Sequence, residues 1–245
     1  MNPALRHEYL AALGLQGWVS RESPQLRAAV QAPREAVIGR EAVIAREPVI
    51  PGDSGAGREA GVDWSELRTR VAACTRCTLC NTRTQTVFGV GNPKADWLIV
   101  GEAPGAEEDR QGEPFVGRAG QLLNSMLRAI GLAREQVYIA NILKCRPPGN
   151  RDPASGEVAQ CLPYLEQQIA LLKPKIMLAV GRIAAQNLLR TDTTLGRLRQ
   201  QVHHFGLSRV PLVVTYHPAY LLRTPTDKRK AWEDLKFARE VCARV

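Results

Sequence analysis

Four short apolar runs, each followed by a stretch with helical spacing, constrain the fold of this chain more than any other feature. The runs are Trp97–Val100, Val137–Asn141, Ile176–Val180 and Pro211–Thr215. The helical stretches are Gln121–Ile130, a segment from an Asp152-Pro153 cap toward Leu172, Ile183–Leu189 and Lys228–Arg244. Strands that alternate with helices form mostly parallel sheets covered by helices. We therefore predict an α/β fold of three layers, α/β/α, with a mostly parallel central sheet.

The residues at the ends of these runs suggest where the chemistry lies. Glu102 follows the first run, Asn141 ends the second, Gly181 follows the third, and His217 comes just after the fourth. In sheets of this kind, ligands bind at the carboxyl ends of the strands. We therefore predict that these residues share one site.

A second group of residues has the spacing of a metal site. Cys74 and Cys77 form a C-x2-C pair, and Cys145 and Cys161 follow further along the chain. This is a pattern of four thiolates for a metal ion or an iron–sulfur cluster. Cys80 extends the pair to C-x2-C-x2-C and is a rival ligand. Cys161 lies on an apolar helical stripe, so a buried core cysteine is the alternative for it.

Charge and hydropathy narrow the class of protein. A formal net charge of +9 favours a polyanionic partner, most often nucleic acid, although a basic protein without such a role is the alternative. No run of about 20 apolar residues is present, so we expect no membrane span. The N-terminus lacks the apolar region of a signal peptide, and we expect a cytoplasmic protein whose thiols stay reduced.

The first quarter of the chain differs from the rest. Residues 1–18 form a short amphipathic segment, predicted to be a docking segment. Residues 19–62 contain a hexapeptide repeat, R-E-A-V-I-G, R-E-A-V-I-A and R-E-P-V-I, followed by a Pro/Gly-rich stretch. This pattern predicts a flexible linker and hence a disordered N-terminal extension. The folded domain is expected at 63–245.

The loop after the first apolar run is rich in glycine. Gly101-Glu102-Ala103-Pro104-Gly105 is neither a phosphate loop nor a dinucleotide fingerprint, and taken alone it is equally consistent with a plain connection. Phe115 follows within a polar segment. Its ring is either a local core plug or a platform for a flat ligand.

Six motifs in order give a specific resemblance. They are C-T-R-C-T-L, V-F-G-V-G-N-P, G-E-A-P-G-A-E-E-D, G-E-P-F-V-G-R-A-G-Q-L-L, N-I-L-K-C-R-P-P and H-P-A-Y-L-L-R. From about Cys74 to the C-terminal helix the chain resembles family 4 uracil-DNA glycosylases, the bacterial and archaeal iron–sulfur branch of that superfamily. The resemblance implies that Cys74, Cys77, Cys145 and Cys161 hold a [4Fe-4S] cluster. Cys80 has no counterpart in the family pattern.

The resemblance also implies roles in the site. Asn141 would bind the uracil edge, because an amide can donate to O4 and accept from N3–H at once, and Phe115 would stack on the flipped base. His217 would act at O2. The carboxylate that assists water would be Glu102, with Glu108 or Asp109 as alternatives, unless the reaction relies on a loose, cation-like transition state. Ala103, where family 1 enzymes carry an acidic residue, is expected beside the base. Glu108 is our candidate for excluding a C5 methyl group.

The residues after His217 are expected to contact DNA. Leu221, Leu222 and Arg223 suit a wedge that fills the space left by a flipped base, with the first turn of a packed helix as the alternative. Phosphate contacts are expected from basic residues near the predicted site. These are Lys144, Arg146, Arg151, Arg223, Lys228 and Arg229.

The predicted function is removal of uracil from DNA, leaving an abasic site without strand cleavage, by a monomeric enzyme. The covalent-trapping branch of the superfamily is an enzyme alternative, but the basic, histidine-bearing insertion that it carries near the Asn141 strand is absent. A catalytically weak adaptor for DNA binding or replication is the other alternative. Residues 1–18 resemble the N-terminal segment of the clamp-loader psi subunit, which implies docking to the clamp loader. The alternative is that this segment packs on its own domain.

Overall fold

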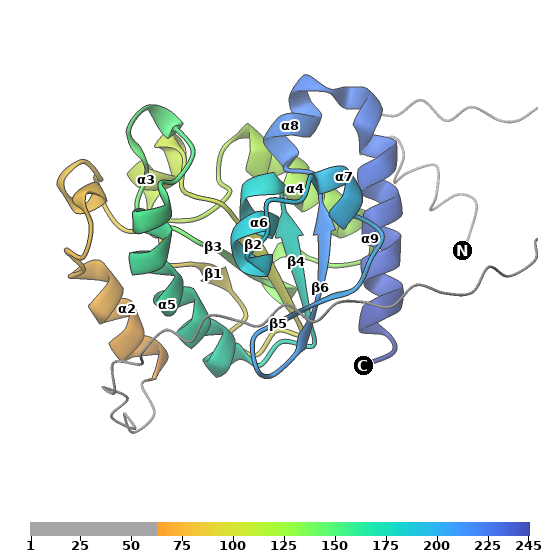
Figure 1. Cartoon of the computed structure of the whole chain (residues 1–245), viewed down its shortest axis with the longest axis horizontal. Helices are drawn as coiled ribbons and strands as arrows, with labels where there is room; N and C mark the ends of the chain where they lie inside the picture. The colour runs from red at the N-terminus through yellow and green to blue at the C-terminus, as the bar shows by residue number, and fades with distance from the viewer. Residues whose placement is uncertain (1–62) are drawn as a thin grey trace, which may run out of the picture. The chain divides into compact units, whose positions relative to one another are not determined.

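A computed structural model describes residues 63–245 (Figure 1). The predicted docking segment at 1–18 and the predicted linker at 19–62 lie outside the described residues. Within this part the chain forms one six-stranded sheet in the order β1-β3-β2-β4-β6-β5. The strands are β1 (Val90–Gly91), β2 (Trp97–Gly101), β3 (Tyr138–Asn141), β4 (Ile176–Val180), β5 (His203–Phe205) and β6 (Val210–Thr215).

The four central strands are parallel, and the two short edge strands are antiparallel to their neighbours. β2 pairs with β3 on one side and with β4 on the other. The order in which the strands are added to the sheet therefore changes direction at β2. Such a reversal opens a crevice at the carboxyl ends of the strands. Glu102 follows β2 at that point.

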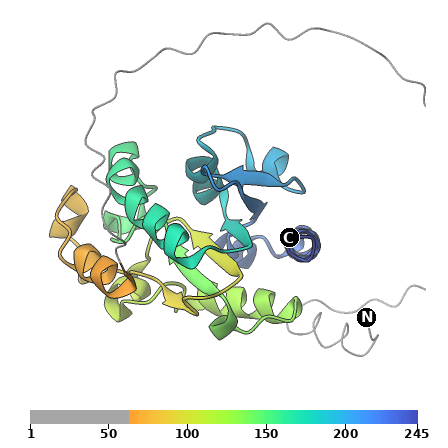
Figure 2. The ribbon, with the colours of Figure 1, turned by 90° about the horizontal axis from the view of Figure 1, so that it is seen from below.

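Helices cover both faces of the sheet, because side chains of a strand alternate between faces. Leu98 and Val100 of β2 pack into one buried cluster, while Trp97 and Ile99 pack into the other. The first cluster lies under α2 (Trp64–Ala72), α5 (Ser155–Leu172), α6 (Arg182–Leu189) and α7 (Leu195–Leu198). The second lies under α4 (Arg118–Ala129), α8 (Pro218–Arg223) and α9 (Lys228–Cys242). The predicted three layers are thus confirmed (Figure 2).

The remaining elements are short. α3 (Ala106–Gln111) follows the glycine-rich loop after β2. Four 3-10 helices connect the larger elements of the described part: Thr78–Asn81, Arg134–Gln136, Pro148–Asn150 and Pro225–Asp227. Among the described residues, no helix combines the length and the apolar character needed to cross a membrane.

One local prediction is wrong. We expected Asp152 to cap the helix toward Leu172, but α5 begins at Ser155 with Ala154 as its cap. The Glu157 side chain accepts a hydrogen bond from the Ala154 N–H at 2.9 Å, which satisfies a free donor of the first turn. Asp152 instead pairs with Arg182 at 3.2 Å.

Candidate active site and cysteine pocket

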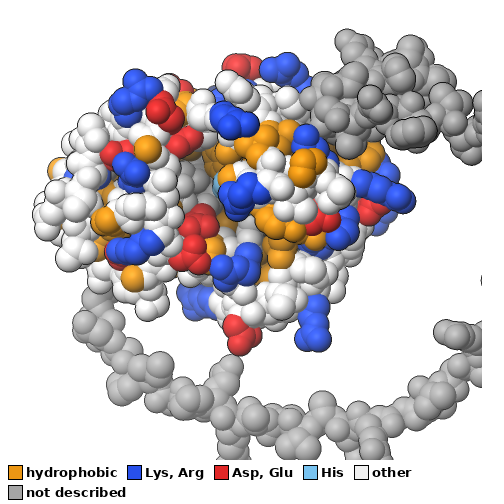
Figure 3. Space-filling view, turned by 90° about the horizontal axis from the view of Figure 1, so that it is seen from above, with side chains coloured by type: hydrophobic (Ala, Val, Ile, Leu, Met, Phe, Trp, Pro, Cys, Tyr) orange, Lys and Arg blue, Asp and Glu red, His pale blue; other side chains and the backbone are white. Residues whose placement is uncertain are grey.

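A cavity of about 680 Å³ lies at the carboxyl ends of the parallel strands. Glu102, Asn141, Gly181 and His217 all line it, so the sheet brings together the four residues that the strand ends indicated. Figure 3 shows this face of the molecule, with Lys and Arg side chains spread over it among acidic and apolar ones. The cavity has the position and the mixed lining of a ligand site.

Asn141 is the most deeply buried polar residue of this cavity, with 2% of its surface exposed. Its Oδ1 has no hydrogen-bond partner within residues 63–245. A β-carbon on Gly101 would lie 2.3 Å from that oxygen, so the glycine makes room for the amide. A buried acceptor without a donor is costly. The Asn141 amide is therefore poised to accept a hydrogen bond from a ligand.

Phe115 lines the same cavity on a strained loop. Its φ of 54° is unusual for a bulky residue. The Arg134 guanidinium holds the loop by donating to the Pro114 carbonyl at 2.6 Å and to the Phe115 carbonyl at 3.3 Å. The Phe115 ring lies 5.6 Å from the ring of His217, with 31° between their planes. The phenyl ring is thus held in place beside the histidine.

His217 is held in one tautomer by its own backbone. Its Nδ1 accepts a hydrogen bond from the Ala219 N–H at 3.1 Å, so the proton of the neutral ring lies on Nε2. Burial, together with the charge of Arg223, lowers the pKa of His217 to about 4. Gly181 has a φ of +100°, and a β-carbon there would lie 2.9 Å from the His217 β-carbon. The site therefore contains a neutral imidazole donor.

Glu102 differs from an ordinary surface carboxylate. Burial and the negative charge of Asp152 raise the pKa of Glu102 to about 7, and the positive charge of Arg182 opposes this rise. Asp152 and Arg182 form an ion pair at 3.2 Å and both line the cavity. A carboxyl group that titrates near neutral pH is suited to general acid or base chemistry.

Two further predicted residues, Ala103 and Glu108, also line the cavity. Glu108 joins two loops: its Oε1 accepts from the N–H groups of Val116 and Gly117 at 3.0 and 3.2 Å, and its Oε2 accepts from Gly105 at 3.1 Å. These bonds fix the carboxylate close to the Phe115 loop. Its exclusion of a methyl group stays a prediction.

Of the residues that we predicted to contact DNA, some are exposed and others are buried. Leu221 is 1% exposed and packs in the core, whereas Leu222 is 37% exposed. Arg223 is exposed and lines the cavity. Lys144 is 1% exposed, so the prediction that it contacts phosphate is wrong. Its ammonium is enclosed by protein groups instead.

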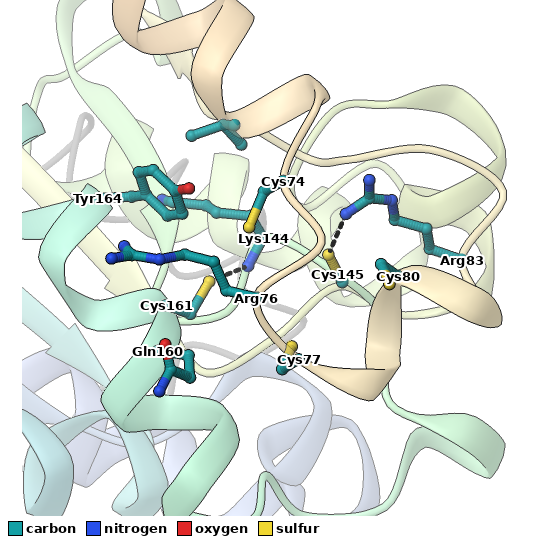
Figure 4. A pocket seen from close by; sticks show the side chains of 11 residues that line it. Cys74, Arg76, Cys77, Cys80, Arg83, Lys144, Cys145, Gln160, Cys161 and Tyr164 are labelled. Carbon is teal, nitrogen blue, oxygen red and sulfur yellow. Dashed lines mark hydrogen bonds between the residues drawn. The ribbon is translucent and has the colours of Figure 1, made fainter.

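Five of the cysteines line a second pocket, which shares no lining residue with the first cavity. Cys74, Cys77, Cys80, Cys145 and Cys161 all line it, together with Arg76, Arg83 and Lys144. Figure 4 shows the sulfur atoms of Cys74, Cys77, Cys145 and Cys161 around a common space, while Cys80 lies beside Arg83. Arg83 donates to the Cys145 sulfur at 3.0 Å, and the Lys144 N–H donates to the Cys161 sulfur at 3.2 Å.

Four thiols with neighbouring cations and N–H donors are a set of side chains that fits an iron–sulfur cluster. Within residues 63–245, no three ligating side chains are placed to hold one metal ion. The neighbouring cations and N–H donors suit thiolates, and burial raises the pKa of Cys161 to about 11 when no metal is bound.

Three residues near the first cavity were missed by sequence reasoning. Arg134 fixes the Phe115 loop, and the Asp152–Arg182 pair acts on Glu102. All three belong to turns or to element ends and make contacts with residues far along the chain. Only the position of Arg182, directly after the strand-end Gly181, gave a signal that could have identified it.

Comparison with known proteins identifies the family. The model of the uracil DNA glycosylase superfamily matches residues 88–236. A type-4 uracil-DNA glycosylase of Archaeoglobus fulgidus is 44% identical over 73% of this chain and 93% of its own length. Type-4 enzymes of Sulfurisphaera tokodaii and Pyrobaculum aerophilum are 40% and 43% identical, over 72% and 71% of this chain and 83% and 92% of their own lengths. The chain belongs to the uracil DNA glycosylase superfamily and, within it, to the type-4 uracil-DNA glycosylases.

Proposed function

We propose that this protein removes uracil from DNA by hydrolysing the N-glycosidic bond, and that it leaves an abasic site. Its relatives are named for this activity. The observation that carries the proposal is the unpaired Oδ1 of the buried Asn141 amide in the strand-end cavity. Uracil has an N3–H donor beside the O4 acceptor, which is the complement of one amide side chain.

Base recognition requires the uracil to leave the helix, at a cost of a few kcal/mol. In the cavity Asn141 would accept from N3–H and donate to O4, and the Phe115 ring would stack on the base. Cytosine presents an unprotonated N3 and an amino group at these positions, so it would meet two mismatched contacts. Sites with such polar pairs discriminate by about 10^4-fold or more.

Bond cleavage leaves negative charge on uracil and positive charge on the sugar. The Nε2–H of neutral His217 would donate to O2 and stabilise the departing anion. Glu102 would position or deprotonate the attacking water in its ionised form. In our proposal Leu222 fills the space of the flipped base and Arg223 contacts phosphate, since both side chains are exposed.

We also propose that Cys74, Cys77, Cys145 and Cys161 hold a [4Fe-4S] cluster. When bound, the cluster would supply cross-linking rather than redox chemistry, since it would join the segment after α2, the loop after β3 and α5. Arg83 and the Lys144 N–H would stabilise the thiolate ligands through hydrogen bonds to sulfur.

The test uses the full chain and a labelled oligonucleotide with one uracil, followed by alkali. Cleavage only after alkali supports hydrolysis that leaves an abasic site. Asn141→Asp should lose most of this activity, because a carboxylate cannot donate to O4. DNA that stays intact after alkali with the wild-type protein would favour the adaptor alternative.

A partner for residues 1–18 is a separate proposal, because these residues lie outside the described part. We propose that they dock a monomeric, cytoplasmic enzyme to a clamp-loader subunit. Peptide 1–20 is expected to retain clamp-loader subunits in a pull-down, and Trp18→Ala to abolish the retention. Absence of binding, with lower thermal stability after deletion of residues 1–60, would instead indicate packing on the glycosylase domain.

A further inference from the structure

Lys144 is a buried lysine that the proposed chemistry does not use. Its surface is 1% exposed, and its Nζ donates to the Asn141 carbonyl at 2.8 Å and to Gln168 Oε1 at 2.7 Å. Lysines are almost never fully buried unless they are paired. The burial and these two hydrogen bonds therefore indicate that this position has a specific requirement for a lysine.

The second acceptor of this ammonium is itself fixed. Gln168 lies in α5 and is 0% exposed. Its Nε2 donates to the Phe88 carbonyl at 2.9 Å and to the Tyr138 hydroxyl at 3.4 Å. Because these bonds orient the Gln168 amide, its Oε1 has a defined place. The ammonium is consequently held between α5 and the end of β3.

The same residue also borders the cysteine pocket. Lys144 lines that pocket, its N–H donates to the Cys161 sulfur at 3.2 Å, and Cys145 is the next residue (Figure 4). Lys144 does not line the cavity that contains Asn141, so we assign its amine no part in bond cleavage. One residue thus contacts both the cysteine pocket and the backbone of the base-reading asparagine.

We propose that Lys144 is a positioning residue for uracil recognition: it fixes the Asn141 carbonyl, and with it the Asn141 amide, relative to the cysteine pocket. The inference rests on the proposed function. Asn141 is the last residue of β3, and the next residue, Ile142, donates its N–H to the Gly101 carbonyl at 3.0 Å. The peptide after Asn141 is thus held on both sides, its N–H by the Gly101 carbonyl and its carbonyl oxygen by the Lys144 ammonium. Displacement of a site group by about 1 Å can reduce a rate by about 10^2-fold.

The test is Lys144→Met in the full chain, which keeps the apolar stem and removes the charge. Iron content and the visible spectrum report the cysteine site, while equilibrium binding of free uracil and single-turnover excision report the cavity. We expect iron content near the wild-type value, uracil binding weakened about tenfold or more, and excision slowed about 10^2-fold. Unchanged uracil binding in a protein with a full iron content would overturn the proposal.

Leu165→Ala is the matched control, because Leu165 is 0% exposed in α5 and contributes only apolar packing to the core. It should lower the melting temperature and leave uracil binding within about twofold of wild type. If Lys144→Met does not fold, Gln168→Leu removes one of the two acceptors of the ammonium. Weaker uracil binding at an unchanged iron content is then expected, and unchanged binding again overturns the proposal. A wild-type protein that does not excise uracil would reject the proposed function instead.

Discussion

Gly101 and Asn141 lie opposite each other at the ends of paired strands, and a β-carbon on Gly101 would come within 2.3 Å of Asn141 Oδ1. The same β-carbon would lie 2.7 Å from the tip of the Phe115 ring. The two groups proposed to bind the base therefore share space that only a glycine leaves free.

Gly101→Ala should slow uracil excision by about 10^2-fold, because either the amide or the ring must move. The measurement is single-turnover excision on a uracil oligonucleotide. Gly156→Ala is the control, since a β-carbon at Gly156 in α5 meets nothing within 4 Å. Wild-type rates for Gly101→Ala would mean that the amide and ring do not hold the base.

The excision rate should rise with pH through about 7, because Glu102 acts in its ionised form and its pKa is about 7. His217, with a pKa of about 4, stays neutral between pH 5 and 9 and adds no second step in that range. Asp152→Asn removes a negative neighbour and should shift the rise to lower pH, whereas Arg182→Gln should shift it to higher pH. The check is the single-turnover pH profile of each variant; a rate that falls as pH increases through 7 would assign Glu102 as an acid instead.

Cys145→Ala should lose the brown colour, the iron and much of the soluble yield, because metal ligation contributes to folding free energy. Iron per chain and melting temperature are the measurements. Cys80→Ala is the matched control and should keep the wild-type iron content and melting temperature. If Cys80→Ala bleaches the protein and Cys74→Ala does not, the ligand assignment is wrong.

Leu222→Ala should impair excision about tenfold more on duplex DNA than on single-stranded DNA, because only the duplex needs a wedge to hold the base out of the stack. Initial rates on the two substrates give the ratio. Leu207→Ala serves as control, since Leu207 is a fully exposed leucine in the turn between β5 and β6. Equal losses on both substrates would exclude the wedge role.

The central strands were predictable because each is a continuous apolar run buried on both faces. Ile176–Val180 was predicted to the residue, and β2, β3 and β6 differ by one residue at one end. β1 and β5 have two and three residues, too few to show any alternation, so the sequence did not reveal them. Asp152 was wrongly predicted as a cap, because the Glu157 side chain competes for the same donors.

The residues of the candidate site that could be predicted are those that directly follow or end a central strand. In a parallel sheet the carboxyl ends meet, so Glu102, Asn141 and His217 were expected together. Lys144 was misread because a lysine two residues before Arg146 suggests an exposed basic segment, and its partner Gln168 is 24 positions away. Arg134 likewise acts through contacts 19 and 20 positions away, which no local pattern reveals.

The cysteine pocket is assembled from segments that are synthesised at different times. Its lining comes from residues 71–83, 144–145 and 160–164, so the four-cysteine set is incomplete until α5 has left the ribosome. At about 5–20 residues per second, the stretch between Cys77 and Cys161 takes about 4 to 17 seconds to translate. During that interval Cys74 and Cys77 are already part of the nascent chain, but Cys161 is not. The cluster that we propose can therefore be completed only late in the synthesis of the chain.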